Sequence, residues 1–170
     1  MRSGPPIWKH VRDVLILPVT VTCVIPWLIH AGSPAWMPTG TVVSWLAVVL
    51  FCSGLLLFAT TLAAFVKRGN GTLAPWTPTQ RLIVSGPYRY CRNPMITGVL
   101  LILCAEALWL RSGWIAVEAV SFLAVNTVYF ILAEEPSMEH RFGQDYRAYK
   151  ADVPRWIPRL KPYFASPDIP

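Results

Sequence analysis

The run VVSWLAVVLFCSGLLLFATTLAAFV, residues 42–66, contains no charged side chain. An α-helix rises about 1.5 Å per residue, so about 20 residues cross a hydrocarbon layer of about 30 Å. A segment that spans the layer must be helical, because lipid offers its backbone groups no hydrogen-bond partners. The run is longer than this minimum, and it therefore predicts a transmembrane helix with room to tilt.

Three further apolar blocks flank this run, at residues 14–29, 95–110 and 114–133. Over the chain of 170 residues, 54% are hydrophobic and 14% are charged, whereas a soluble domain has about 25% charged residues. The first block favours a membrane helix over a cleaved signal peptide, because Pro18 and Pro26 interrupt it. We therefore predict an all-α integral membrane fold in which four transmembrane helices form two hairpins.

The basic residues mark one side of the membrane. They precede the first block, lie between the second and third blocks, and follow the fourth, with Arg111 as the only exception. By the positive-inside rule, both termini and the middle loop are cytoplasmic. The net charge of +6 is then explained by basic residues that lie on the cytoplasmic side and contact the lipid surface. No nucleic-acid-binding motif accompanies it. We expect a single multi-pass domain over residues 1–170, with an N-terminal hairpin (1–66) and a second half (67–170), whose partner is the bilayer and not nucleic acid.

The cysteines and histidines do not predict a metal site. Three of the four cysteines lie inside apolar blocks, Cys91 lies in the middle loop, and the three histidines are far apart. No two cysteines have the spacing of a zinc knuckle or of a redox pair. We therefore expect no metal cofactor.

Two polar segments adjoin the second predicted hairpin. GPYRYCRNPMITG, residues 86–98, leads into the third block, and EEPSMEHRFG, residues 134–143, follows the fourth. Because a hairpin returns to the side from which it started, the two segments should lie beside each other at the cytoplasmic surface. An arginine and two carboxylates would then meet at the cytoplasmic end of an apolar helical bundle.

Such a group of side chains suits either of two roles. An arginine binds a carboxylate or phosphate, a carboxylate accepts from an ammonium or a ribose, and tyrosine rings stack, which together fit an amphoteric nucleoside cofactor. The alternative is ordinary anchoring, because Tyr and Arg are common at bilayer boundaries and Glu134 and Glu135 would cap the next helix ahead of Pro136. Residue types alone leave both roles open.

The order of motifs narrows the choice. The chain resembles the shared C-terminal half of the isoprenylcysteine carboxyl methyltransferase and phospholipid N-methyltransferase superfamily, over roughly residues 71–160. The usual family pattern is Arg-His-Pro-x-Tyr-x-Gly, a Glu-Glu pair, Phe-Gly-x-x-Tyr-x-x-Tyr and Val-Pro-Arg. The matching residues here are Arg92, Pro94 and Gly98, then Glu134 and Glu135, then Phe142, Gly143, Tyr146 and Tyr149, and finally Val153, Pro154 and Arg155.

The resemblance implies a small helical membrane enzyme that uses S-adenosylmethionine as its cofactor and methylates a membrane lipid or a prenylated substrate. It implies that Arg92 and Glu134 bear on catalysis by clamping charged groups of the cofactor and acceptor. The cofactor-binding residues carried over are Tyr88, Arg92, Asn93, Pro94, Met95 and Gly98 from the third helix and its approach, and Glu134 and Glu135 from the end of the fourth.

Two departures bear on the acceptor. Asn93 stands where the carboxyl methyltransferases usually have His, and Ile96 stands where Tyr is usual. An amide donates and accepts hydrogen bonds, but it is not a base near neutral pH. Asn-Pro-Met followed by Glu-Glu-Pro is similar to the phosphatidylethanolamine methyltransferase form. The resemblance as a whole implies carboxyl O-methylation of an isoprenylcysteine, and this last similarity supports the alternative, phospholipid N-methylation. A membrane reductase and a non-catalytic homologue are weaker alternatives.

The remaining polar features concern the tail and the membrane interior. Met138, Phe142 and the two tyrosines that follow recur at near-helical spacing, which predicts a cytoplasmic interfacial helix broken near Gly143. VPRWIPRLKP then predicts an extended strap. Glu106 and Glu118 lie within apolar blocks and suit a functional role by default, although pairing with Arg111 or protonation would also account for them.

Overall fold

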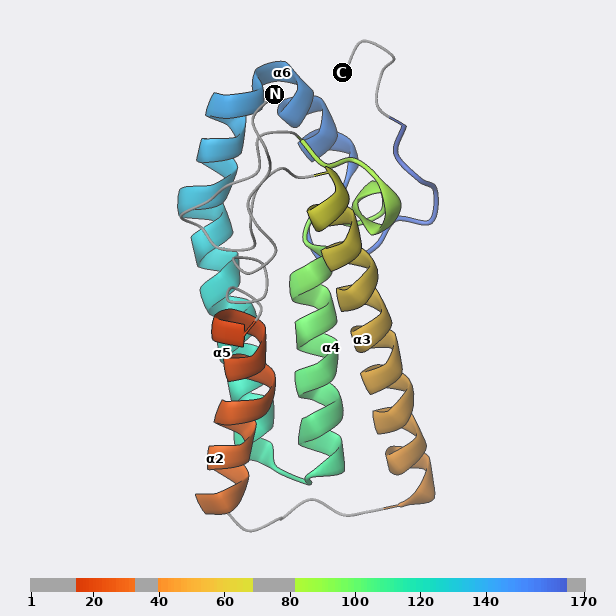
Figure 1. The fold of residues 1–170 in the computed structure, drawn as a ribbon, viewed down its shortest axis with the longest axis vertical. Coiled ribbons are helices and arrows are strands. Elements are labelled where there is room, and N and C mark those ends of the chain that lie inside the picture. Colours follow the sequence, from red (N-terminus) through yellow and green to blue (C-terminus); the bar gives the residue numbers. More distant parts are fainter. Residues whose placement is uncertain (1–14, 33–39, 69–81, 165–170) are drawn as a thin grey trace.

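The computed structural model describes residues 15–32, 40–68 and 82–164. Every regular element in these ranges is helical and none is a strand, which confirms the all-α prediction (Figure 1). The N-terminal basic residues and the middle loop up to residue 81 lie outside the described residues. The elements are η1 (Leu15–Val24), α2 (Ile25–Gly32), α3 (Thr41–Arg68), η2 (Gly86–Arg89), α4 (Pro94–Trp109), α5 (Gly113–Tyr129), η3 (Phe130–Glu134) and α6 (Glu135–Asp152).

Prolines shape the start of the first helix and of α4. Pro18 lies inside η1, which is a π-helical turn region that runs directly into α2; a proline in a helix lacks the N–H that would close the regular ladder. Pro94 instead begins α4, where a missing N–H costs little. The tight connection from α4 to α5 passes through Arg111 at a φ of 53°, and the Ser112 hydroxyl accepts a hydrogen bond from the N–H of Ile115 to cap α5.

Two of the four predicted spans meet the length and composition of a membrane-crossing helix within the described residues. These are Thr41–Ala64 of α3 and the run that starts at Gly113 and continues through η3 into α6. The helices Ile16–Gly32 and Pro94–Trp109 are apolar but shorter. Large apolar side chains of α3 and α5 also point outward, including Val42 at 81% exposure and Val120 at 69%. Exposed apolar surface of this extent indicates contact with lipid, and the four-span topology stays a prediction.

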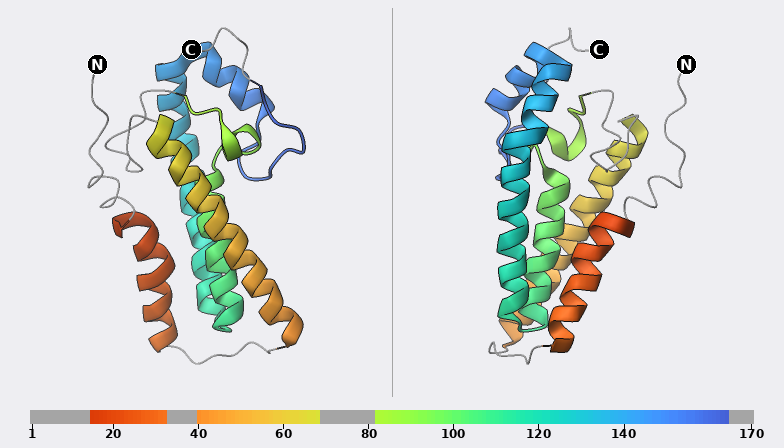
Figure 2. Two further views of the ribbon diagram at one scale, coloured as in Figure 1. Left: turned by 45° about the vertical axis from the view of Figure 1, so that its right-hand side comes forward. Right: turned by 90° about the vertical axis from the view of Figure 1, so that its left-hand side faces the viewer.

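The packing of the helices links the two predicted hairpins. Helices α4 and α5 do pack together, but the most extensive contact in the bundle is between α3 and α4. Helix α2 packs against α5, and η1 against α4 (Figure 2). Glycines at the crossing of α3 and α4 bring those two helices into close contact. The N-terminal hairpin stays a prediction.

Beyond the bundle, α6 folds over one end of it (Figure 1). Gly143 adopts φ 55° and ψ −126° and breaks α6 into two parts, as predicted; glycine tolerates this conformation because it has no Cβ. The second part contributes Tyr146 and Tyr149 to a small buried core with Val153 and Tyr163. We call residues 153–163 the C-terminal strap. The strap and the segment before α4 lie at the same end of the bundle as α6.

Candidate functional site

A pocket of about 640 Å³ opens at the α6 end of the bundle. Its apolar lining includes Val21 of η1, Phe58 of α3, Val99 of α4 and Phe122 of α5. Its polar lining comes mainly from the segment before α4 and from α6, and α5 adds Asn126. The volume falls within the range of about 300–1,000 Å³ that is usual for small-molecule sites. The pocket thus joins a polar mouth to an apolar interior formed by helices.

Five of the eight sequence-predicted cofactor residues line this pocket: Tyr88, Arg92, Asn93, Met95 and Glu134. The other three lie outside its lining. Pro94 is fully buried at the first turn of α4, Gly98 lies in the contact with α3, and Glu135 belongs to a group of ion pairs. The structure therefore separates the predicted set into side chains that face the pocket and side chains that hold the surrounding structure.

Arg92 links the pocket to the protein behind it. Its Nη1 donates to Oε1 of Glu135 at 2.8 Å, and its side chain is 11% exposed. The Nε of Arg92 is buried and has no hydrogen-bond partner in the part of the chain that the structure describes. Because Nε is also closed to solvent, a ligand in the pocket can reach only the rest of the Arg92 side chain, which lines that pocket.

Glu135 is shared by three cations. Besides Arg92, its Oε1 accepts from Nε of Arg155 at 3.0 Å and from Nη2 at 2.6 Å, and its Oε2 lies 2.9 Å from Nζ of Lys150. Burial alone would raise the pKa of this carboxyl, but hydrogen bonds from Lys150 and Arg155 and the charge of Arg92 hold it below its ordinary value. Glu135 is therefore an ionised structural carboxylate.

Glu134 is in a different environment from Glu135. It lines the pocket just beyond the apolar part of the α5 run. Burial raises the pKa of this carboxyl to about 7, with Arg141 lowering it and the Glu135 charge raising it. A carboxyl with a pKa near 7 takes up and releases protons at neutral pH. Glu134 is therefore suited to exchange a proton with a bound molecule at neutral pH.

Tyrosines close the pocket from the side of α6. The hydroxyl of Tyr149 donates to the carbonyl of Tyr88 at 2.6 Å. Burial raises the pKa of both phenols, so both stay protonated. Tyr146 lines the pocket as well. Tyr146 and Tyr149 therefore both line the pocket and belong to the buried core, and contact with a ligand stays a prediction.

Further lining residues from α6 were missed by the sequence interpretation. Ser137, Met138 and Arg141 all face the pocket with Glu134. Their positions are three, four and seven residues after Glu134. Residues at these spacings share one face of a helix. That spacing from Glu134 was the signal in the sequence that could have found them.

The C-terminal strap holds the segment that carries Arg92. The N–H of Arg92 donates to the carbonyl of Pro154 at 2.9 Å, and the N–H of Arg159 donates to the carbonyl of Tyr90 at 2.9 Å. The N–H of Tyr163 donates to the carbonyl of Arg89 at 2.9 Å, and Nε of Arg89 donates back to the carbonyl of Tyr163. These bonds run along both segments like those between strands, so the backbone around Arg92 is fixed from outside the bundle.

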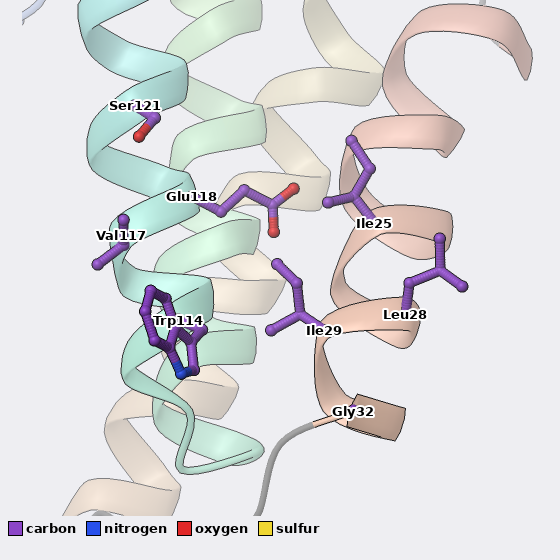
Figure 3. A pocket seen from close by; sticks show the side chains of 8 residues that line it. All are labelled: Ile25, Leu28, Ile29, Gly32, Trp114, Val117, Glu118 and Ser121. Atoms are coloured by element: carbon purple, nitrogen blue, oxygen red, sulfur yellow. The ribbon is translucent and has the colours of Figure 1, made fainter.

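The two acids within the helices lie away from this pocket. Figure 3 shows Glu118 of α5 projecting toward Ile25 and Ile29 of α2, in a separate apolar groove. Both carboxylate oxygens of Glu118 and Oε2 of Glu106 are buried and lack hydrogen-bond partners among the described residues. Within the described ranges, neither acid forms an ion pair with Arg111. The same ranges contain no group of three or more His, Cys, Asp or Glu side chains that could hold a metal.

Comparisons with known proteins indicate which family the chain resembles. The model of a family described as phospholipid methyltransferase matches residues 42–145, which is more than half of the chain. A protein of Haemophilus influenzae described as uncharacterized is 38% identical over 63 residues, which cover 37% of this chain and 100% of that protein. No solved structure matches the chain. The family match starts in α3 and ends within α6, so the C-terminal strap lies beyond it.

Proposed function

The chain belongs to the phospholipid methyltransferase family, a family of methyltransferases, and on that premise we propose that it transfers a methyl group from S-adenosylmethionine to a lipophilic acceptor at the membrane interface. The observation that carries the proposal is the pocket itself. It places Arg92, Asn93 and Glu134 at one end of a cavity whose remaining lining is largely apolar side chains of four helices.

The residues present fit the cofactor. S-Adenosylmethionine has a carboxylate, an ammonium, ribose hydroxyls and an aromatic base. Arg92 supplies a guanidinium, Glu134 supplies a carboxylate, and Tyr88 and Tyr146 supply rings. When bound, the cofactor provides a sulfonium-activated methyl group, so the chain needs no metal for this chemistry. The protein's task is to orient the acceptor and to exclude water.

The apolar lining suits the tail of the acceptor. Leu17 and Val21 come from η1, Phe58 from α3, and Phe122 and Val125 from α5. We propose that an acyl or prenyl chain lies among these side chains while its head group reaches Arg92 and Glu134. This arrangement agrees with four helices crossing the bilayer, with both termini and the pocket mouth on the cytoplasmic side.

The first acceptor class is a carboxylate, as in isoprenylcysteine carboxyl methyltransferases. A carboxylate is already a nucleophile at neutral pH and requires no base. Arg92 would orient it through a charge-assisted hydrogen bond. The supporting observation is that the side chain of Arg92 lines the pocket. Asn93 in place of the usual histidine does not oppose this class, because no proton has to be removed.

The second acceptor class is the amine of a phospholipid such as phosphatidylethanolamine. An ammonium must lose a proton before its nitrogen can attack a methyl group. Glu134 lines the pocket with a pKa raised by burial to about 7, so it is suited to accept that proton. The position of Glu134 is the specific observation that keeps this acceptor in consideration.

The decisive experiment is cofactor binding by the purified protein in detergent, followed by transfer of a labelled methyl group. Calorimetry should show binding of S-adenosylmethionine and S-adenosylhomocysteine but not of NADPH. Labelled methyl should then appear on either a prenylcysteine analogue or phosphatidylethanolamine. Binding of NADPH alone would instead indicate a membrane reductase, and binding of neither cofactor would indicate a non-catalytic homologue.

Substitutions locate the reaction. We expect Arg92→Ala and Glu134→Ala each to abolish turnover, because they remove the two charged side chains that we place on cofactor and acceptor. Arg147→Ala is the matched control, since Arg147 is 61% exposed and pairs only distantly with Glu139. Near-normal turnover in both pocket variants would show that the reaction occurs elsewhere.

A further inference from the structure

The partners of Glu135 distinguish Arg155 from the other basic residues of the tail. Arg155 donates to Glu135 from two nitrogens, Nε and Nη2. Its side chain is 19% exposed and lies outside the pocket lining. Both of its bonds end on Oε1, which is the same oxygen that accepts from Nη1 of Arg92. Arg155 and Arg92 are therefore joined through one carboxylate oxygen.

The backbone of Arg155 is held just as firmly. Its carbonyl accepts from the N–H of Asn93 at 3.3 Å and from Sγ of Cys91 at 3.0 Å. The preceding carbonyl, of Pro154, accepts from the N–H of Arg92. The strap therefore brings the Arg155 side chain to Glu135 through bonds to the residues on both sides of Arg92. A change of the Arg155 side chain leaves these main-chain bonds in place.

We propose that Arg155 is a positioning residue for Arg92. It holds the Glu135 carboxylate in one orientation, so that Nη1 of Arg92 stays bound to it and the guanidinium keeps the orientation in which it lines the pocket. This inference rests on the proposed function, in which Arg92 binds S-adenosylmethionine. It adds a role for a side chain that does not line the pocket and that lies beyond the part of the chain matched by the family model.

The physical reason is that a carboxylate on a flexible side chain must be fixed before it can fix another group. Lys150 holds Oε2 at 2.9 Å, but its side chain is 35% exposed and it also binds Glu139, so solvent weakens this contact. Arg155 supplies a forked guanidinium that restricts both distance and direction. Without it, the Glu135 carboxylate can rotate, and Arg92 moves with it.

The test is a double-mutant cycle read out by S-adenosylhomocysteine binding. Arg155→Gln alone should weaken binding by roughly tenfold, an effect of about 1.4 kcal/mol. Arg155→Lys should recover part of the loss, because it restores the charge without the fork. In an Arg92→Lys background, Arg155→Gln should weaken binding less than about twofold further, since two residues that act through one contact are not additive. Arg159→Gln is the matched control, because its side chain binds the carbonyl of Asp152 and not Glu135.

Separate outcomes test the two levels of the proposal. If the wild type binds no S-adenosylhomocysteine, the proposed function fails. If the wild type binds and Arg155→Gln binds equally well, or if its effect is fully additive with Arg92→Lys, the positioning role is overturned and the proposed function stands. Alkylation of Cys91, followed by mass spectrometry, monitors the strap. It should stay slow in Arg155→Gln, and fast alkylation would show that the strap has detached, which would also overturn the positioning role.

Discussion

Gly98 of α4 lies directly against Gly54 of α3. A Cβ on Gly98 would come within 2.9 Å of the Gly54 carbonyl oxygen, and a Cβ on Gly54 would come within 2.7 Å of the Gly98 carbonyl oxygen. The two backbones are therefore in contact, as is usual where small residues meet between membrane helices. Because α4 begins immediately after Arg92 and Asn93, this contact also sets the position of the pocket mouth.

Gly98→Ala should destabilise the bundle. The new methyl group would meet the backbone of Phe58 at 3.0 Å as well as Gly54, and backbone cannot move aside as a side chain can. We expect a loss of about 1–3 kcal/mol, as for other overpacked contacts, measured as a lower thermal unfolding midpoint in detergent. Gly32→Ala is the control, because nothing lies within 4 Å of its Cβ position. An unchanged midpoint for Gly98→Ala would argue against this helix crossing.

Glu134→Gln should change the pH dependence of methyl transfer to an amine. With a pKa of about 7, Glu134 is ionised above that pH and is then able to accept the proton that the amine releases. Turnover of a phospholipid amine should therefore fall as the pH drops through about 7, and the variant should be slow and lack this step. Turnover of a carboxylate acceptor should show no such step. A pH profile that is identical in the wild type and the variant would exclude Glu134 as the proton acceptor.

The neighbouring acids Glu134 and Glu135 should change the pH dependence of stability in opposite directions. The raised pKa of Glu134 gives stability that is fully present below its ordinary value of 4.5 and is lost as the pH rises through about 7. The lowered pKa of Glu135 gives stability that is present above its ordinary value and is lost as the pH falls through the lowered one. Thermal unfolding between pH 4 and pH 8 should thus show a decline toward neutral pH that Glu134→Gln removes. Retention of that decline in the variant would assign it to another group.

Glu118→Leu should stabilise the protein. Its two carboxylate oxygens are buried without hydrogen-bond partners among the described residues, in an apolar groove, and an unsatisfied buried polar group costs about 1–3 kcal/mol. Leucine has similar length and removes that cost, so the unfolding midpoint should rise while methyl transfer stays unchanged. Glu118→Gln should give little gain, because it leaves a polar group buried. A lower midpoint for the leucine variant would show that the carboxylate has a stabilising partner.

The sequence predicted the helices well because hydropathy is a local property. The block at residues 95–110 became α4 (Pro94–Trp109), and the break expected near Gly143 occurs at that residue. Pairing of the helices is not local. A close contact between α3 and α4 joins Gly54 to Gly98. Nothing in the sequence around a single glycine in an apolar run indicates which residue of another run it contacts.

The sequence predicted which two segments form the candidate site, but not which of their side chains face the pocket. The Arg92 segment and the Glu-Glu pair do meet, but two successive helical residues point about 100° apart. Only Glu134 lines the pocket, while Glu135 binds Arg92 from behind. The resemblance assigned catalysis to Glu134 but placed both glutamates in the cofactor site. The role of Glu135 depends on where Arg155 and Lys150 arrive from the tail. These contacts depend on the tertiary structure, and no spacing of residues in the sequence predicts them.

The proposed topology predicts that the two ends of the bundle are labelled from opposite sides of the membrane. In a cysteine-free chain, Leu160→Cys would lie in the strap, where Leu160 is 98% exposed, and Gly40→Cys would lie before α3, where nothing lies within 4 Å of a Cβ. Three proposed spans separate these positions, so a membrane-impermeant maleimide should reach position 40 in sealed right-side-out vesicles and position 160 only after permeabilisation. The cysteine-free parent should keep its unfolding midpoint, which ensures that labelling reports the native fold. Labelling of both positions from the same side would require an even number of crossings between them, and the four-span topology would then be wrong.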